Sequence, residues 1–352
     1  MKFGSIRVEN AVGAIVAHAV HIGDLVLKKG VVVRAEVVPA LRDAGLREIV
    51  VAQLEPDDIS ENEAARIIAE AIAGSEARVD RAFTGRANLF AQSAGVLKIA
   101  EAGIHAINAV DEAITLATLP AFRAVVPGEM IGTVKIIPFA VPRPAVERAL
   151  ALAADHLIDV APFRPMRVGV VSTMLPGLKP SVITKTLSHL ADRLAPAGAR
   201  IVADERVPHD TATLAATLTT LSHVADLLVV FGASAITDRR DVIPAALEAA
   251  GGEIEHFGMP VDPGNLLLLG HLGAVQVLGA PGCARSPKEN GFDWILNRIL
   301  AGIPVAGSDI RQLGVGGLLM EIVSRPQPRA GAAEAAKQQG VQSSEQRDGT
   351  AA

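Results

Sequence analysis

The chain has 352 residues and a net charge of −5, and half of its residues are apolar, which excludes a wholly disordered chain. The acidic balance and an aromatic content of 3% argue against a nucleic-acid partner. The single cysteine, Cys283, excludes an intrachain disulfide and a thiolate metal cluster within the chain. No uncharged apolar run reaches about 18 residues, so we expect no membrane span and predict a cytoplasmic protein.

The first half of the chain predicts a mixed α+β region over residues 1–165. Periodicity and turn residues indicate helices around Val37–Ala44, Ile59–Ala73 and Arg86–Ala100, a strand at Glu48–Ala52, and a hairpin over Val125–Ile137 with Pro-Gly at its turn. Prolines from Pro138 to Pro165, with one short helix at Ala145–Ile158 between them, predict a break in the chain.

Residues 166–325 alternate strands with helices. The run Leu227–Phe231 is wholly apolar, which is typical of a central parallel strand buried on both faces. Further strands are expected at Arg167–Ser172, Arg200–Ala203, Leu266–Leu269 and Val275–Leu278, and helices are expected to begin at Ser181, at Asp210 or Thr211, at Val242 and at Asn290. This order predicts an α/β fold with a doubly wound, mostly parallel sheet.

The segment 326–352 differs from the rest of the chain in composition. It holds one β-branched apolar residue, Val341, and no Leu, Ile, Met or aromatic residue. Such a segment buries too little apolar surface to offset the entropy lost on ordering, so we predict a disordered tail.

Three loops follow predicted strands and precede helices, which is where open α/β sheets bind their ligands. They are Ser172–Ser181, Gly232–Asp241 and Ala280–Asn290. Each combines small residues with hydroxyl side chains and a Lys or Arg, so backbone N–H groups and helix N-termini can approach an anion. Together they predict a pocket for a phosphorylated polar ligand. Neither GxxxxGK[ST] nor GxGxxG occurs, which argues against a P-loop or a standard dinucleotide site.

The second loop resembles the signature of molybdopterin-binding domains, which occur in molybdopterin adenylyltransferases and molybdopterin molybdotransferases. In Gly232–Leu247 a Gly/Ser/Thr loop follows an apolar strand, and Arg-Asp-Val-x-Pro then opens a helix. Pro281-Gly282 with Ser286 resembles the family's second signature, and Pro263-Gly264 fits a third in the molybdotransferase branch. The chain to about Arg325 is similar to the molybdopterin-binding module found ahead of a nucleotidyltransferase domain in some bacterial proteins.

This resemblance implies a pterin phosphate, molybdopterin or its adenylate, as the ligand, together with Mg²⁺ and molybdate. The residues that it assigns to ligand binding are Thr173, Gly232, Ser234, Thr237, Asp238, Arg240, Pro281, Gly282, Ser286 and Lys288. It assigns catalysis to Asp241 and Asp210, and metal binding to Asp241 and Asp262. The implied function is molybdenum cofactor biosynthesis, by adenylyl handling or by Mg²⁺-dependent molybdate insertion. A nucleotidyltransferase or a molybdoenzyme is the implied partner, and a homo-oligomer is compatible with it.

Several of these residues also fit a structural explanation. Asp241 and Asp210 stand where helix N-caps are expected, and Asp262 precedes a proline as turn residues do. The first loop departs from the family, because Met174–Gly177 carries no acid where the family has Gly-Asp-Glu, and His209 stands at the family's second carboxylate. The alternative function is therefore a non-catalytic carrier of the cofactor that works with a partner enzyme.

Overall fold

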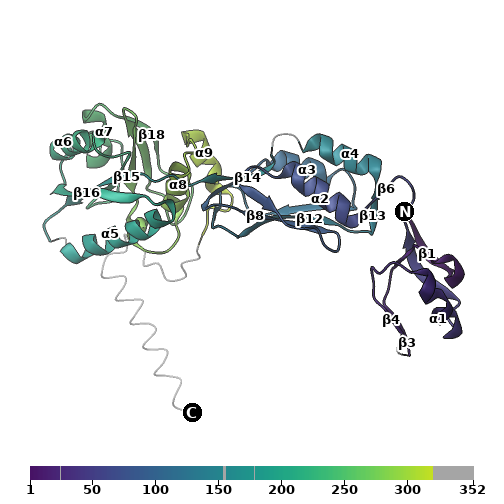
Figure 1. Cartoon of the computed structure of the whole chain (residues 1–352). Helices are drawn as coiled ribbons and strands as arrows, with labels where there is room; N and C mark the ends of the chain where they lie inside the picture. The colour runs from purple at the N-terminus through teal and green to yellow at the C-terminus, as the bar shows by residue number, and fades with distance from the viewer. Residues whose placement is uncertain (24, 154–155, 178, 320–352) are drawn as a thin grey trace, which may run out of the picture.

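A computed structural model describes residues 1–23, 25–153, 156–177 and 179–319. Within these ranges the hydrophobic clusters follow one another along the chain as an N-terminal module, a middle domain and a C-terminal α/β domain (Figure 1). The predicted tail, 326–352, lies outside the described residues. None of the helices in the described part of the chain combines the length and the apolarity needed to cross a bilayer.

The N-terminal module packs a small sheet of order β1-β5-β2 and a β3-β4 hairpin around a core of its own that includes Val8, Leu41 and Val51. The predicted helix at Val37–Ala44 and the predicted strand at Glu48–Ala52 are confirmed to within one residue at each end. The element bounds are β1 (Lys2–Arg7), β2 (Ile15–Val16), β3 (Val20–Ile22), β4 (Leu25–Leu27), α1 (Val38–Asp43) and β5 (Glu48–Gln53).

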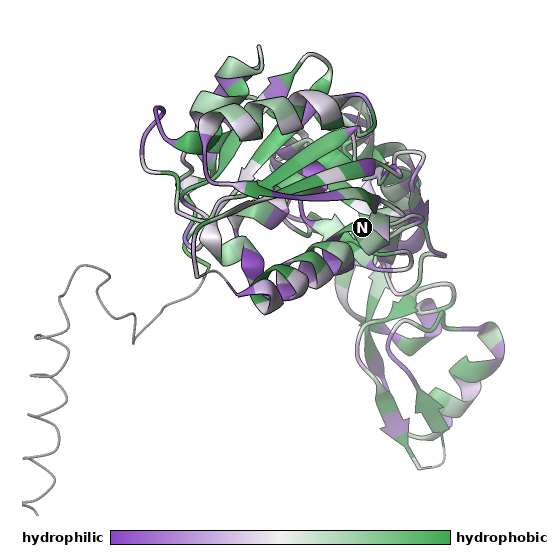
Figure 2. Cartoon of the chain, turned by 90° about the vertical axis from the view of Figure 1, so that its left-hand side faces the viewer, coloured by the Kyte–Doolittle hydropathy of each residue, from purple (hydrophilic) through white to green (hydrophobic). Residues whose placement is uncertain are grey.

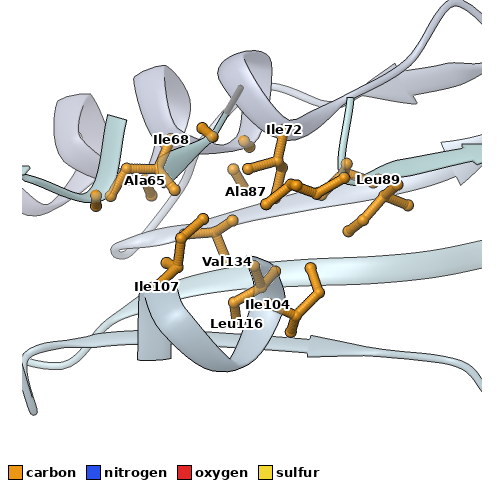
Figure 3. Packing of buried hydrophobic residues seen from close by; sticks show 14 of the residues in the cluster. Ala65, Ile68, Ile72, Ala87, Leu89, Ile104, Ile107, Leu116 and Val134 are labelled. Carbon is orange, nitrogen blue, oxygen red and sulfur yellow. The ribbon is translucent and has the colours of Figure 1, made fainter. Parts of the chain in front are cut away.

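The middle domain packs helices against a four-stranded antiparallel sheet of order β10-β12-β8-β7. Its core forms because α2 (Glu61–Ile72) carries apolar residues at helical spacing, and Ile68 and Ile72 point toward Ala87 and Leu89 of the sheet (Figure 3). The predicted helix Ile59–Ala73 is thereby confirmed. The other bounds are β6 (Asp58–Ser60), β7 (Ala77–Val79), β8 (Arg86–Ala91), β9 (Gly95–Ile99), α3 (Glu101–Asn108), β10 (Ile114–Thr118), β11 (Ala124–Val125), β12 (Met130–Ile136), β13 (Ala140–Pro142), α4 (Arg143–Leu152) and β14 (Ile158–Pro162).

Two predictions for the middle domain are wrong. The expected helix Arg86–Ala100 is instead the strands β8 and β9, and burial alternates along β8 with the period of two that a strand requires. The expected hairpin Val125–Ile137 does turn at Pro-Gly, but its two strands do not pair. β11 pairs with β9, whereas β12 pairs with β8 and β10, so the turn carries the chain from one sheet to another.

The C-terminal domain is built on a six-stranded sheet of order β16-β15-β17-β20-β19-β18. The first four strands in this order are parallel, and β19 and β18 are antiparallel to their neighbours. The predicted doubly wound, mostly parallel sheet is confirmed. The bounds are β15 (Arg167–Met174), α5 (Pro180–Leu194), β16 (Arg200–Pro208), α6 (Thr211–Ser222), β17 (Leu227–Phe231), α7 (Val242–Ala249), β18 (Glu253–Phe257), β19 (Leu268–Leu272), β20 (Val275–Ala280), α8 (Gly291–Leu300) and α9 (Gly307–Arg311).

The central strand β17 is apolar along its whole length because helices cover both of its faces. Leu227, Val229 and Phe231 belong to the cluster that includes α5 and α8, whereas Leu228 and Val230 belong to the cluster that includes α6 and α7. The inner strands of this sheet are accordingly strongly hydrophobic between the helices (Figure 2).

Three details of this domain differ from prediction. Helix α5 begins at Pro180, and Lys179 stands at its N-cap position without a side-chain capping bond, so Ser181 lies inside the first turn. Strand β16 runs on to Pro208, well past the expected end at Ala203. The edge strand β18 was not predicted, because its sequence Glu-Ile-Glu-His-Phe is polar in part and it pairs with only one neighbour.

Helix α8 also contacts the middle domain. The buried guanidinium of Arg298 lies 3.7 Å from the ring centroid of Phe122, and the backbone N–H of Arg164 donates to the carbonyl of Leu300 at 2.8 Å. The chain passes from β14 to β15 beside this contact. The last two turns of α8 are therefore fixed against the domain that precedes the sheet.

Candidate functional site

The order of the strands reverses between β15 and β17, and the term crevice denotes the carboxyl edge of the sheet at this switch point. From β15 the chain passes through α5 to β16 on one side, and it then crosses through α6 to β17 on the other side. After β15 the chain continues to one side of the sheet, and after β17 it continues to the other side. Open α/β sheets bind their ligands at the carboxyl ends of the two strands where the direction changes in this way. All three loops singled out in the sequence begin at the carboxyl ends of adjacent strands: β15, β17 and β20.

Thr173 joins the first two loops at the crevice. Its side chain is fully buried, and its Oγ1 accepts a hydrogen bond of 2.8 Å from the backbone N–H of Ala233. The same oxygen lies 2.8 Å from Nδ1 of His209, and the backbone N–H of His209 donates to the carbonyl of Met174. The predicted ligand residue Thr173 thus has a positioning role: it fixes the start of the second loop and the end of β16.

The second loop is held in shape by its own carboxylates. Asp241 caps α7, where Oδ1 accepts from the N–H of Val242 at 2.8 Å and Oδ2 accepts from the N–H of Thr237 at 3.2 Å. Asp238 accepts from Nε of Arg240 at 2.7 Å and from its backbone N–H at 2.9 Å. These bonds to Arg240 lower the pKa of Asp238 to about 2.

Gly232 begins this loop at a position where a side chain does not fit. A Cβ there would lie 2.6 Å from the carbonyl oxygen of Ser234 and 2.9 Å from Cδ1 of Ile243. Ser234 and Thr237 are exposed, so their hydroxyl groups are accessible from solvent. The loop therefore presents backbone and hydroxyl groups at the crevice while its carboxylates bond within it.

The third loop begins with a short 3-10 turn, Gly282–Arg285, which Pro281 precedes. Ser286 accepts from the backbone N–H of Lys288 at 3.3 Å, and the side chain of Lys288 is exposed. A Cβ added to Gly282 would meet nothing within 4 Å, so the backbone there faces open space. This arrangement leaves Gly282 and Lys288 accessible to a ligand.

Asn290 ends the third loop by capping α8. Its side chain accepts from Phe292, and Asp293 accepts from the N–H of Asn290, which completes a capping box. The backbone carbonyl of Pro263 accepts a hydrogen bond of 2.8 Å from the N–H of Gly291. Gly264 packs closely against the same residue, because a Cβ added to Gly264 would lie 2.7 Å from the Gly291 nitrogen. The predicted third signature, Pro263-Gly264, is thus in direct contact with the start of α8.

Two arginines that the sequence analysis did not single out organise the third loop. Arg193 of α5 pairs with Asp293 at 2.5 Å and donates to the carbonyls of Ala284 at 3.1 Å and Ser286 at 2.7 Å. Arg285 reaches back from the loop and donates to the carbonyl of Gly232 at 2.9 Å. Arg193 is separated from its partners by about a hundred positions in the chain, so no local signal reveals it, whereas Arg285 lies inside a loop that the analysis did select.

The other two predicted carboxylates, Asp210 and Asp262, have local structural contacts of their own. Asp210 caps α6 by accepting from the N–H of Thr213 at 2.8 Å, and this hydrogen bond lowers its pKa. Asp262 lies in a segment whose backbone pairs with Gly317 and Leu319. No group of three or more His, Cys, Asp or Glu residues in the described ranges is placed to hold a metal ion. The described residues therefore do not form a protein cage for Mg²⁺.

These features define a class of protein: a doubly wound α/β domain in which three loops meet at the topological switch point of the sheet. Residues 172–302 match the family described as a probable molybdopterin binding domain. Residues 5–53, most of the N-terminal module, match a domain of unknown function, DUF8806.

Comparison with solved structures finds the molybdopterin biosynthesis MoeA protein of Pyrococcus horikosii at 16% identity, covering 88% of this chain and 75% of that one, with a TM-score of 0.28. The molybdopterin biosynthesis enzyme MoaB of Thermus thermophilus matches at 16% identity over 40% of this chain and 98% of its own, with a TM-score of 0.28. Scores this low support no conclusion about function. No curated protein matches the chain in sequence.

Proposed function

We propose that the C-terminal domain binds a pterin phosphate, molybdopterin or its adenylate, and serves molybdenum cofactor biosynthesis. The observation that supports this most is the convergence of three loops in a domain that matches the molybdopterin-binding family. Thr173 of the first loop bonds to Ala233 of the second, and Arg285 of the third bonds to Gly232 of the second. One ligand at the carboxyl ends of β15, β17 and β20 is therefore within reach of all three.

The accessible groups of these loops suit a phosphate better than a cation. The backbone around Gly282 faces open space, and its N–H groups, the hydroxyls of Ser234 and Thr237, and the ammonium of Lys288 are all donors. In contrast, both carboxylate oxygens of Asp241 already accept hydrogen bonds from the loop. We propose that these donors hold the phosphate of the ligand and that the carboxylates shape the loops.

A second candidate, a non-catalytic carrier of the cofactor, is favoured by the structural roles of the predicted catalytic carboxylates. The side chains of Asp241 and Asp210 accept hydrogen bonds as the N-caps of two different helices, α7 and α6. Binding of Mg²⁺ stays a prediction. Because the described residues contain no cluster of three or more His, Cys, Asp or Glu side chains placed to bind a metal ion, Mg²⁺ would take most of its oxygen ligands from phosphates and water, as it commonly does. The cytoplasmic location, a nucleotidyltransferase or molybdoenzyme partner and a homo-oligomer also remain predictions.

Titration of the purified full-length chain with molybdopterin tests the proposed function. Lys288→Gln removes a cation from the site, and we expect about ten- to a hundredfold weaker binding, the effect of losing a charge-assisted contact of about 1.5–3 kcal/mol. Arg167→Gln is the matched control, because Arg167 pairs with Asp226 at the amino end of β15. A wild-type protein that neither binds the pterin nor carries one by mass spectrometry after purification contradicts the proposal.

The same preparation separates the enzyme from the carrier. Adenylated molybdopterin is incubated with molybdate and Mg²⁺, and cleavage of the adenylate is followed over time. Binding with Mg²⁺-dependent cleavage supports the enzyme, whereas binding without cleavage supports the carrier.

A further inference from the structure

A buried hydroxyl at the end of β15 has no hydrogen-bond partner. The side chain of Ser172 is 1% exposed, and its Oγ forms no hydrogen bond with any described residue. Neighbouring Thr173, in contrast, has both of the bonds described above. An unpaired buried hydroxyl is unfavourable, and few occur in folded proteins. Ser172 is therefore a donor for which the described chain supplies no acceptor.

Arg285 is a half-buried cation that no described carboxylate neutralises. Its guanidinium donates to two neutral oxygens, Oγ1 of Thr186 at 3.2 Å and the carbonyl of Gly232 at 2.9 Å. Burial lowers its pKa, and no nearby acid offsets this effect. Arg193, which contacts the same loop, is paired with Asp293. A buried cation is normally paired with an anion, so the difference between the two arginines indicates that Arg285 receives its anion from outside the chain.

The guanidinium of Arg285 also keeps donors free. Two of its five N–H groups are used in the bonds to Thr186 and Gly232, which leaves the others for a ligand. Its Nε takes no part in either of these bonds. The hydroxyl of Thr186 is already committed, because it donates to the carbonyl of Val182 at 2.8 Å and accepts from Arg285. Thr186 thus positions the arginine.

Ser172 and Arg285 belong to the same face of the sheet. Ser172 is paired in register with Phe231, and the guanidinium of Arg285 lies 5.3 Å from the centroid of the Phe231 ring. Because side chains alternate along a strand, Ser172 shares its face with Val168 and Val170, which pack in the cluster that includes α5 and Phe231. Ser172 and Arg285 therefore both lie beside Phe231, on the face of the sheet that α5 covers.

We propose that Arg285 and Ser172 form a subsite for one tetrahedral, doubly charged oxyanion, with Thr186 and Phe231 holding the guanidinium in place. Such an anion accepts from the free N–H groups of Arg285 and from the hydroxyl of Ser172, which satisfies both. Two sources share this chemistry: a phosphate group of the ligand, and a free oxyanion such as molybdate. The proposal rests on the proposed function only for the identity of the larger ligand.

Binding of simple oxyanions to the full-length chain tests this subsite without the pterin. Inorganic pyrophosphate, inorganic phosphate and molybdate are titrated separately by calorimetry, and the fluorescence of the single tryptophan, Trp294 on α8, provides a second signal. Arg285→Gln should weaken binding about ten- to a hundredfold, and Arg285→Lys, which keeps the charge but not the fork of donors, should weaken it less. Arg167→Gln should bind as the wild type does.

Ser172→Ala gives an independent result that does not depend on the folding of the arginine variants. Removal of an unpaired buried hydroxyl should leave the melting temperature unchanged or raise it, while oxyanion binding becomes several-fold weaker.

Tighter binding of molybdate than of phosphate and pyrophosphate identifies the free oxyanion as the source, and the reverse order identifies a phosphate group. Failure of the wild type to bind any of the three, or equal binding by Arg285→Gln, overturns the subsite. Oxyanion binding that depends on Arg285 in a protein that does not bind molybdopterin upholds the subsite and contradicts the proposed function instead.

Discussion

Replacement of Arg193 by methionine is the sharpest test of how the third loop is held. Met keeps much of the apolar stem but removes the guanidinium. The change leaves Asp293 without its cation and removes donors from the carbonyls of Ala284 and Ser286. The start of α8 is then weakened as well, because Asp293 is also part of the capping box with Asn290.

The burial of the Arg193–Asp293 pair sets the loss of stability that we expect for Arg193→Met. The side chains of Arg193 and Asp293 are 10% and 16% exposed, so the pair is largely shielded from water. Removing one partner of a buried pair costs about 3–5 kcal/mol, and the remaining exposure favours the lower end. For a domain of this size each kcal/mol lowers the melting temperature by about 2–4 °C, so a loss of about 3 kcal/mol corresponds to roughly 6–12 °C.

Trp294 makes the assay specific to this domain. It is the only tryptophan of the chain, and its indole N–H donates to Glu289 at 2.9 Å, next to the affected loop. Thermal unfolding followed by its fluorescence therefore reports the C-terminal domain. Asp293→Asn and the double variant complete a cycle, in which the double variant should lose less stability than the sum of the singles. A midpoint within about 2 °C of the wild type for Arg193→Met would refute this reasoning.

Three further predictions concern the second loop. Gly232→Ala should destabilise the domain by about 1–3 kcal/mol and weaken pterin binding, because its Cβ meets the Ser234 carbonyl; an unchanged melting curve contradicts this. Asp241→Asn should keep the cap but lose the bond from Thr237, so melting should shift only by the loss of about 0.5–1.5 kcal/mol, and a larger shift would show further contacts. Arg240→Ala should raise the pKa of Asp238 from about 2 toward its ordinary value in a carboxyl NMR titration. Because folding lowers this pKa, the contribution of Asp238 to stability is full above the ordinary carboxyl range and is lost as the pH falls toward about 2.

The fold of the C-terminal domain was predictable because its signals are local. The apolar run Leu227–Phe231 indicates a strand covered on both faces, and Asp210 and Asp241 stand at helix N-caps both in the sequence analysis and in the structure. Prediction was wrong for Arg86–Ala100, where alanine and leucine favour a helix on propensity alone. There the buried alternation of Ala87, Leu89 and Ala91 against α2 outweighs that preference.

For the candidate site, the sequence predicted which loops take part but not how their charged side chains are paired. Small residues and hydroxyls after apolar strands indicate where a ligand binds, but they do not show which charges are already satisfied. Asp241 accepts hydrogen bonds from its own loop, and this depends on how the loop folds. Arg285 contacts neutral oxygens and no carboxylate, and this depends on contacts between segments that are distant in the sequence. The importance of Arg193 likewise depends on α5 lying beside a loop that follows it by about ninety residues.

Helix α8 connects the third loop of the candidate site to the middle domain. Its ten residues span about 15 Å. Asn290 and Asp293 fix one end to the third loop, and the contact of Arg298 with Phe122 fixes the other end to the preceding domain. A helix of this length does not bend easily between two such anchors. A rotation of the middle domain about the β14–β15 connection would therefore be transmitted through α8 to the 281–290 loop.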